Sequence, residues 1–331
     1  MSKVDLSVDF CGLRLRNPLV LAAGAPGTFS GESILRAAKY GVAAIMTYAV
    51  GPEPCVIDRP TFAFVSGGLL NTTTFSDVSE DRWIKKEIPA AKKAGIPIFT
   101  GVDLRFGIDA MQKTARKLTE AGVDMLVVAT MDPKDLPPLV KLVGEVTDLP
   151  IIGKIGPSPH MEMVGEPIER AGADAIMAIN GPWGMRINVE TGKPMLGSLR
   201  GVAHFCGAPI FPLAVFATYV LSSTVKIPIL GGGGVTTGED IVELLMAGAT
   251  AVGSCTGVMI RGGPESAGLM IKELETTLDR RGTRSAREII ACTKDFLKGR
   301  TRNDLVTDII PPDIDDDLCT ACGACAKSCP W

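Results

Sequence analysis

The chain has 331 residues, of which 46% are hydrophobic and 21% charged, a composition that excludes a disordered chain and allows a large buried core. Its 34 basic and 37 acidic residues are intermixed and give a formal net charge of −3, so a nucleic-acid partner is not expected. No segment reaches the ~20 apolar residues of a membrane helix, and the first residues lack the apolar part of a secretory leader, so we expect a cytoplasmic protein without a membrane partner.

Short apolar runs rich in valine and isoleucine recur along the chain, and each is followed by a longer amphipathic segment. The runs are 19–23, 43–48, 96–102, 125–130, 151–155, 175–180, 227–231 and 251–255. Several amphipathic segments end in a glycine such as Gly41, Gly95 or Gly122, which can take the left-handed conformation that stops a helix. Eight strand–helix units predict an α/β fold, a closed (β/α)8 TIM barrel over residues 1–300, in preference to an open doubly wound sheet.

Two connections are too long to be simple turns. They span residues 50–82, after the second strand, and 181–208, after the sixth. Both follow the carboxyl ends of strands, where the loops of such barrels build active sites, so we expect functional loops rather than plain surface insertions.

The chain changes character after the eighth strand. Helices are expected over residues 265–280 and 286–297, whereas Pro311, Pro312 and the aspartate-rich residues 313–317 are typical of a solvated linker. Residues 301–331 are therefore interpreted as a linker followed by a small tail.

The tail is rich in cysteine. Cys319, Cys322, Cys325 and Cys329 precede a proline in the pattern C-x2-C-x2-C-x3-C-P, the ferredoxin run whose thiolates hold a [4Fe–4S] cluster. Zinc is the alternative, but structural zinc sites usually use two separated C-x2-C pairs. The fourth cluster ligand stays open between Cys329, Cys292 and a group from another subunit, because in two-cluster ferredoxins the last cysteine serves the other cluster.

A glycine-rich strand end points to a phosphate. Residues 229–235 include four consecutive glycines and lead into residues 236–240, which open the next helix with capping residues. Glycines expose backbone N–H groups, and a helix N-terminus adds partial positive charge. Residues 253–257 end the eighth strand, and the loops after strands seven and eight commonly hold phosphate in barrels, so we expect a phosphorylated cofactor there.

Taken together, these residues resemble the dihydroorotate dehydrogenase family, including the related ferredoxin-bearing subunit of dihydropyrimidine dehydrogenase. The resemblance covers roughly residues 5–280 and is carried by residues 17–24, Lys154, Asn180, residues 184–188, Lys193, Pro194 and residues 231–240. It implies FMN at the barrel mouth, with Lys154 close to the N1–C2 edge of the flavin, where a cation stabilises the charge of the reduced ring.

The resemblance also implies further cofactor contacts. They come from Ala22, Ala23, Gly24, Thr47, Asn71, Lys154, Asn180, Gly207, Gly232, Gly233, Gly234, Cys255 and Thr256. Lys154 and Asn180 are at the same time candidate catalytic residues.

The chain departs from the family where the proton chemistry lies. The family carries N-x-[SC]-x-P-N after the fourth strand, with Cys or Ser as general base, whereas residues 127–134 lack both the amide and the base. The family's lysine after the second strand is Tyr48, and Gly181 replaces a hydroxyl residue. Because polar recognition sites discriminate strongly, we predict that dihydroorotate is not the substrate. By position, the candidates for proton transfer are Thr130, Asp132, Lys134, His204 and Cys206.

The leading functional hypothesis is an FMN enzyme that adds or removes hydride across a carbon–carbon bond and passes electrons through the [4Fe–4S] cluster. It would need a small-molecule substrate and a redox partner protein at the tail, in a homo-oligomer or hetero-oligomer. The alternatives are a non-catalytic flavin and iron–sulfur subunit of a larger redox complex, and a barrel that binds a phosphorylated metabolite without flavin.

Overall fold

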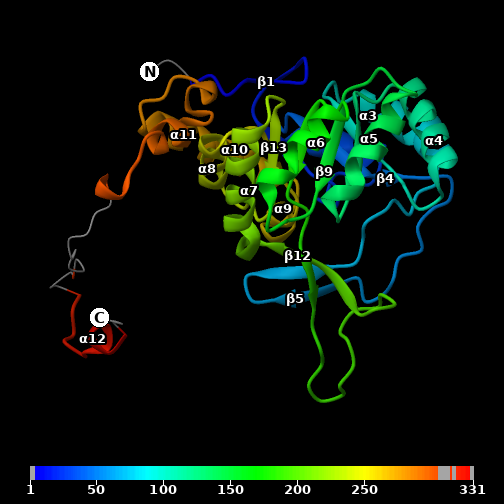
Figure 1. Ribbon diagram of the computed structural model, residues 1–331. Helices are drawn as coiled ribbons and strands as arrows, with labels where there is room; N and C mark the ends of the chain where they lie inside the picture. The colour runs from blue at the N-terminus through cyan, green and yellow to red at the C-terminus, as the bar shows by residue number, and fades with distance from the viewer. Residues whose placement is uncertain (1–3, 305–313, 315–317, 329–331) are drawn as a thin grey trace. The chain divides into compact units, whose positions relative to one another are not determined.

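The computed structural model describes residues 4–304, 314 and 318–328. Contacts between residues divide the chain into two compact units, Met1–Phe296 and Leu297–Trp331, so the division falls a few residues before the boundary expected at residue 300. The first unit contains the barrel and the second contains the cysteine-rich tail (Figure 1).

Eight parallel strands close into a barrel, which confirms the predicted fold class. Each strand is hydrogen-bonded to two neighbours in the closed order β10-β13-β14-β3-β4-β7-β8-β9. Their bounds are β3 Leu19–Leu21, β4 Ala44–Val50, β7 Ile98–Val102, β8 Met125–Thr130, β9 Ile151–Ile155, β10 Ala175–Ala178, β13 Ile229–Gly232 and β14 Ala249–Ser254. Their side chains are almost all buried, as expected for strands that face a packed barrel interior on one side and helices on the other.

Helices follow the strands. The main ones are α1 Gly31–Ala38, α2 Glu80–Arg82, α3 Ile88–Lys92, α4 Ile108–Glu120, α5 Leu136–Gly144, α6 Gly165–Arg170, α7 Phe211–Thr224, α8 Gly238–Ala247, α9 Thr256–Ile260 and α10 Glu265–Arg280. Short 3-10 or π turns are η1 Trp83–Glu87, η2 Pro133–Asp135, η3 Met161–Met163, η4 Ala208–Ile210, η5 Ala286–Ile289 and η6 Arg302–Asp304. The glycines after α1, α3 and α4 have φ angles of 87°, 65° and 86°, which confirms their role as helix stops.

One predicted helix is wrong. Residues 286–297 form η5 and then the separate helix α11 Cys292–Leu297, because Ala291 between them has a φ of 64°, outside the range of a right-handed helix. None of the helices in the part of the chain that the structure describes is long and apolar enough to cross a membrane.

An antiparallel hairpin, β1 Val8–Phe10 and β2 Leu13–Leu15, packs at the amino end of the barrel. Phe10 is fully buried, and its ring centroid lies 6.2 Å from that of Phe99 near the beginning of β7. This aromatic contact packs the hairpin against the barrel near the amino end of β7.

The two long connections pair with each other. They form a four-stranded antiparallel sheet in the order β11-β12-β6-β5, with bounds β5 Phe62–Val65, β6 Gly68–Asn71, β11 Trp183–Met185 and β12 Val202–Gly207. We call it the lid sheet; Figure 1 shows β5 and β12 at the end of the barrel opposite to β1. Its register aligns Phe62, Asn71, His204 and Trp183 in one row across the sheet.

The β6–β12 contact is the link between the two connections, and it can be tested at Gly68. A Cβ atom there would collide with the carbonyl oxygen of Cys206 on β12. We expect Gly68→Ala to lower the free energy of unfolding by about 1–3 kcal/mol and to expose the lid sheet to protease.

Thermal unfolding and limited proteolysis measure this effect. Gly144→Ala in α5 is the matched control, since its Cβ would meet only the Ile151 side chain at 3.7 Å and alanine favours the helix. Equal stability of the two variants would show that the lid sheet tolerates the added methyl group.

Candidate active site

A cleft lies at the carboxyl ends of the barrel strands, covered on one side by the lid sheet. Its empty space, including the part open to solvent, is about 990 Å³, at the upper end of the range for sites that enclose small ligands. Its walls combine apolar strand residues with a few polar groups from both long connections.

Most of the predicted site residues line this cleft. They are Ala22, Ala23, Thr47, Asn71, Lys154, Asn180, His204, Cys206, Gly207, Gly233, Gly234, Cys255 and Thr256. Gly24, Gly232, Thr130, Asp132 and Lys134 are not among the lining residues. Gly24 still lies next to the cleft, because a Cβ on it would stand 2.7 Å from the hydroxyl oxygen of Tyr48 and 3.2 Å from Cys255 Sγ.

Lys154 is the cation of the cleft. It lies on β9 between Ala129 of β8 and Met177 of β10. Its side-chain nitrogen makes no hydrogen bond or ion pair within the described residues. Burial lowers the pKa of Lys154, and the nearby Cys255 and Cys206 oppose this shift. A lysine amine without an ion-pair partner favours binding of an electron-rich ligand. The position of Lys154 therefore fits the flavin edge that the resemblance implies.

The ends of β13 and β14 fit a phosphate. Gly234 and Thr256 line the cleft, and no partner is recorded for their backbone N–H groups in the part of the chain that the structure describes. Gly233 and Gly234 have φ angles of 115° and 80°, which favour glycine. When bound here, FMN supplies both two-electron hydride chemistry and one-electron transfer.

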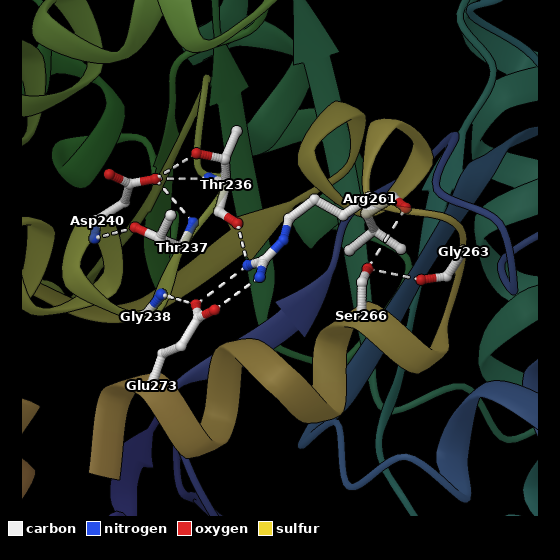
Figure 2. Close-up of polar contacts among 9 residues, drawn as sticks. Thr236, Thr237, Gly238, Asp240, Arg261, Gly263, Ser266 and Glu273 are labelled. Atoms are coloured by element: carbon white, nitrogen blue, oxygen red, sulfur yellow. Dashed lines mark hydrogen bonds and ion pairs between the residues drawn. The ribbon is translucent and has the colours of Figure 1, made fainter. Parts of the chain in front are cut away.

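The N-terminus of α8 does not take part, contrary to the interpretation of residues 236–240 as a phosphate-binding helix start. Figure 2 shows why: the Asp240 carboxylate accepts hydrogen bonds from the backbone N–H groups of Thr236 and Thr237 at 2.7 and 2.8 Å. The Glu273 carboxylate accepts from Gly238 N–H at 2.8 Å and from the Arg261 guanidinium at 2.6 and 3.0 Å. The chain's own carboxylates therefore satisfy the backbone N–H groups at this helix start, so these groups are not free to bind a phosphate.

His204 faces the cleft from β12 with a defined orientation. Only 7% of the residue is exposed, its Nδ1 lies 3.0 Å from the carbonyl oxygen of Gly181, and its ring stacks on Trp183 at 4.6 Å. Burial lowers the pKa of His204, and Lys154 adds to this effect. The neutral ring donates from Nδ1–H to Gly181, so Nε2 can only accept a hydrogen bond.

Tyr48 was missed as a site residue by the sequence analysis, which noted it only as a departure from the family. Its hydroxyl lies 2.6 Å from Thr73 Oγ1, and Thr73 Oγ1 lies 2.6 Å from Asn71 Oδ1. Tyr48 and Thr73 both line the cleft. The signal that could have identified Tyr48 is that it stands near the end of a barrel strand where the family carries a lysine, so one polar residue replaces another.

The loop after β8 contributes no lining residue to the cleft. Val127 and Ala129 of β8 itself line the cleft, whereas the Thr130 hydroxyl donates to the carbonyl of Asp132 at 2.9 Å. The Asp132 carboxylate accepts from the Lys134 backbone N–H at 3.0 Å and so begins η2. The hydrogen bonds of Thr130 and Asp132 thus stabilise the conformation of the loop after β8.

The cysteine tail contains the residues expected to bind the cluster. Cys319, Cys322 and Cys325 are exposed free thiols, Cys325 lies on α12 Ala324–Ser328, and Cys329 lies outside the described residues. The pKa of Cys322 is lowered, chiefly by a hydrogen bond from the Ala324 backbone N–H, which favours the thiolate that binds metal. Among the described residues no three ligand side chains are close enough to hold a metal ion, so the fit to a cluster rests on donor chemistry and spacing. Cys292 packs partly buried against the barrel core.

A closed barrel with an unpaired lysine and a glycine-lined phosphate end defines a flavin-binding oxidoreductase barrel. Comparisons agree, because a profile described as "Dihydroorotate dehydrogenase" matches residues 5–278 and one described as "4Fe-4S binding domain" matches residues 312–331. The chain belongs to the dihydroorotate dehydrogenase family, and its cofactors are FMN and a [4Fe–4S] cluster.

Curated relatives cover most of the chain. "Dihydroorotate dehydrogenase B (NAD(+)), catalytic subunit" from Geotalea uraniireducens is 30% identical over 315 residues, which are 88% of this chain and 98% of that protein. The proteins of the same name from Methanosarcina mazei and Methanosarcina acetivorans are 32% identical over 312 residues and 33% identical over 264 residues. They cover 88% and 74% of this chain and 96% and 82% of the relatives.

The role of Lys154 is testable through the cofactor's reduction potential. A hydrogen bond from a charged group contributes about 1.5–3 kcal/mol, and ~30 mV corresponds to ~1.4 kcal/mol for a two-electron couple. We therefore expect Lys154→Met to make the flavin potential more negative by about 30–65 mV. Lys141→Met, on the exposed side of α5, is the control in the same spectroelectrochemical titration. If the flavin potential of Lys154→Met equals that of the control, Lys154 does not stabilise the reduced flavin.

The α8 start is testable through the pH dependence of stability. The pKa of Glu273 is lowered, first by its hydrogen bond to Arg261, so its contribution is present above the carboxyl's ordinary value of 4.5 and is lost as the pH falls through its lower value in the folded protein. Because the pair is partly exposed, we expect Glu273→Gln to cost about 1–2 kcal/mol at pH 7 and little at pH 3.

Urea unfolding at both pH values measures the difference. Glu239→Gln is the matched control, since the Glu239–Arg280 pair on the same two helices is mostly exposed and worth about 0.5 kcal/mol or less. A Glu273→Gln deficit that persists unchanged at pH 3 would contradict an ionic origin.

Proposed function

We propose that the protein is an FMN-dependent oxidoreductase that acts on an activated carbon–carbon bond of a small molecule other than dihydroorotate. Electrons would pass between the flavin and a partner protein through the [4Fe–4S] cluster. The observation that carries the proposal is a cleft that keeps the fit to the flavin but has Ala129 and Val127 where its family carries an amide and a general base.

The walls of the cleft support a change of substrate. A site built to hold a polar ring with amide side chains rejects it when those side chains are absent, because the buried groups of the ligand are left unpaired. Here Asn180 Nδ2 has the Met131 sulfur as its recorded partner at 3.8 Å, and Gly181 offers no hydroxyl. The relatives are named for dihydroorotate dehydrogenase and are about 30% identical to this chain.

A partner protein is supported by two observations. The relatives are described as catalytic subunits, which implies a larger assembly for those proteins. In the tail of this chain the thiols of Cys319, Cys322 and Cys325 are exposed, as expected where electrons leave for another protein.

The experiment uses the full chain with both cofactors under anaerobic conditions. The photoreduced protein is mixed with fumarate, uracil, 2-cyclohexen-1-one and orotate, and flavin absorbance is followed. We expect at least one activated alkene other than orotate to reoxidise the flavin, and dihydroorotate to leave the oxidised flavin unchanged.

Each other outcome has a defined meaning. Flavin reduction by dihydroorotate at the rate of an authentic dihydroorotate dehydrogenase would contradict the substrate proposal. Reoxidation by one-electron acceptors alone, with every alkene inert, would instead identify a flavin and iron–sulfur electron-transfer subunit without substrate chemistry of its own.

A further inference from the structure

We propose that Tyr48 is the proton donor of the active site when the enzyme reduces a carbon–carbon double bond. This inference rests on the proposed function and assigns to it a catalytic residue. It is carried by a hydrogen-bonded chain of three side chains on the wall of the cleft, Tyr48, Thr73 and Asn71.

The position of the phenol suits transfer to a bound substrate. Tyr48 lies in β4, close to its carboxyl end, and lines the cleft, and its ring packs beside Phe29 with centroids 5.8 Å apart. Its hydroxyl is next to Gly24, which belongs to the turn expected beside the flavin ring. The hydroxyl therefore lines the same cleft as the residues assigned to the flavin.

The side chains hydrogen-bonded to the phenol, Thr73 and Asn71, can stabilise both the phenol and the phenolate. Asn71 Oδ1 is held in place because it accepts a hydrogen bond from the Thr73 backbone N–H at 2.8 Å. The Thr73 hydroxyl lies 2.6 Å from both Tyr48 Oη and Asn71 Oδ1. It can accept from the phenol while donating to Asn71, and after proton transfer it can turn and donate to the phenolate.

His204 and Lys154 are less suited to donation than Tyr48. The proton on His204 Nδ1 is given to Gly181, and the neutral ring has no proton on Nε2. Lys154 is the residue that we assign to the flavin edge. Cys206 is the competing donor, because its thiol proton, like that of Tyr48, is held in a hydrogen bond, here to the carbonyl of His204 at 3.5 Å.

The protonation state of the phenol fits proton donation. Burial raises the pKa of Tyr48 to about 12, with a smaller contribution from the Cys255 thiol, and the hydrogen bonds with Thr73 and Asn71 oppose this shift. Cys206 adds slightly to the increase. At neutral pH the oxygen therefore holds its proton and can protonate a carbanion.

The reaction balances with these groups. Bound FMN, when reduced, would supply a hydride to one alkene carbon, and Tyr48 Oη would give its proton to the neighbouring carbon. The carbon–carbon π bond, the flavin's bond to the hydride and the O–H bond break, two C–H bonds form, and the phenolate recovers a proton from water. Two electrons from the partner protein through the cluster, together with one proton from water, would restore the reduced flavin.

The test compares Tyr48→Phe with Tyr40→Phe, whose ring is 41% exposed at the end of α1 and outside the cleft. With the alkene that reoxidises the wild-type flavin fastest, we expect Tyr48→Phe to slow reoxidation 10²–10⁴-fold. Reoxidation by ferricyanide needs no proton and measures electron transfer in the same sample. Thr73→Val should slow alkene reduction by about 10-fold, the effect of one lost hydrogen bond of ~1.4 kcal/mol.

A second measurement needs no turnover. With only three tyrosines in the chain, ¹³C labelling of tyrosine Cζ gives a resonance for Tyr48 that Tyr48→Phe identifies. We expect this resonance to stay at its protonated position between pH 6 and pH 10. Titration of the phenol below pH 8 would overturn the assignment, whatever the activity.

The outcomes separate the two proposals. If no alkene reoxidises the wild-type flavin, the proposed function fails and this inference with it. If an alkene does so and Tyr48→Phe matches Tyr40→Phe, only the inference about Tyr48 is overturned. A loss in Cys206→Ala but not in Tyr48→Phe would overturn it in favour of the thiol.

Discussion

The parallel pairing of β14 with β3 is the interaction on which the site depends. It joins the last barrel strand to the first, and the hydrogen bond from Ala22 N–H to the carbonyl of Ser254, at 2.9 Å, extends this pairing to the edge of the cleft. Residues more than two hundred positions apart in the chain, Gly24 and Cys255, therefore face each other. Without this closure the turn at Gly233 and Gly234, after β13, and the turn at Gly24, after β3, would lie at opposite edges of an open sheet.

The electrostatics of the cleft centre on Lys154, which has no anionic partner among the described residues. Burial raises the pKa of the Cys206 thiol to about 11 and of the Cys255 thiol to about 12, so these neighbours of Lys154 stay neutral. Burial also lowers the pKa of His204. Because burial lowers the pKa of Lys154 as well, a ligand that gains electrons would supply the negative charge that stabilises its ammonium form.

The lid sheet adds what a bare barrel lacks. Asn71 and Thr73 come from the first long connection and His204 and Cys206 from the second, and the β6–β12 pairing holds them above the barrel strands. A small cluster of Ala63, Leu70, Leu196 and Ala203 packs on the opposite face of the lid sheet. Since the strands of this sheet carry polar groups into the cleft, a change of loop sequence changes the chemistry while the flavin end stays constant.

The sequence by itself determined the barrel and its cofactors. Eight apolar runs, the glycines that stop the helices and the spacing of the tail cysteines are local signals, each written within a few residues. The sequence also pointed to Lys154 and to the turn at Gly233 and Gly234. A charged residue in an apolar strand and a run of glycines can be recognised without knowledge of their tertiary contacts.

Only the tertiary structure decided the pairing of the two long connections and the groups they deliver. Strand pairing across more than a hundred residues has no local signal, so nothing in the sequence joined Asn71 to His204. The same holds for Tyr48, which acquires a role only when Thr73 lies 2.6 Å from its hydroxyl, and for Asp240 and Glu273, whose carboxylates close a helix start that looked open. Hydrogen bonds have a range of about 3 Å, so they are decided by where the chain folds and not by which residue types it contains.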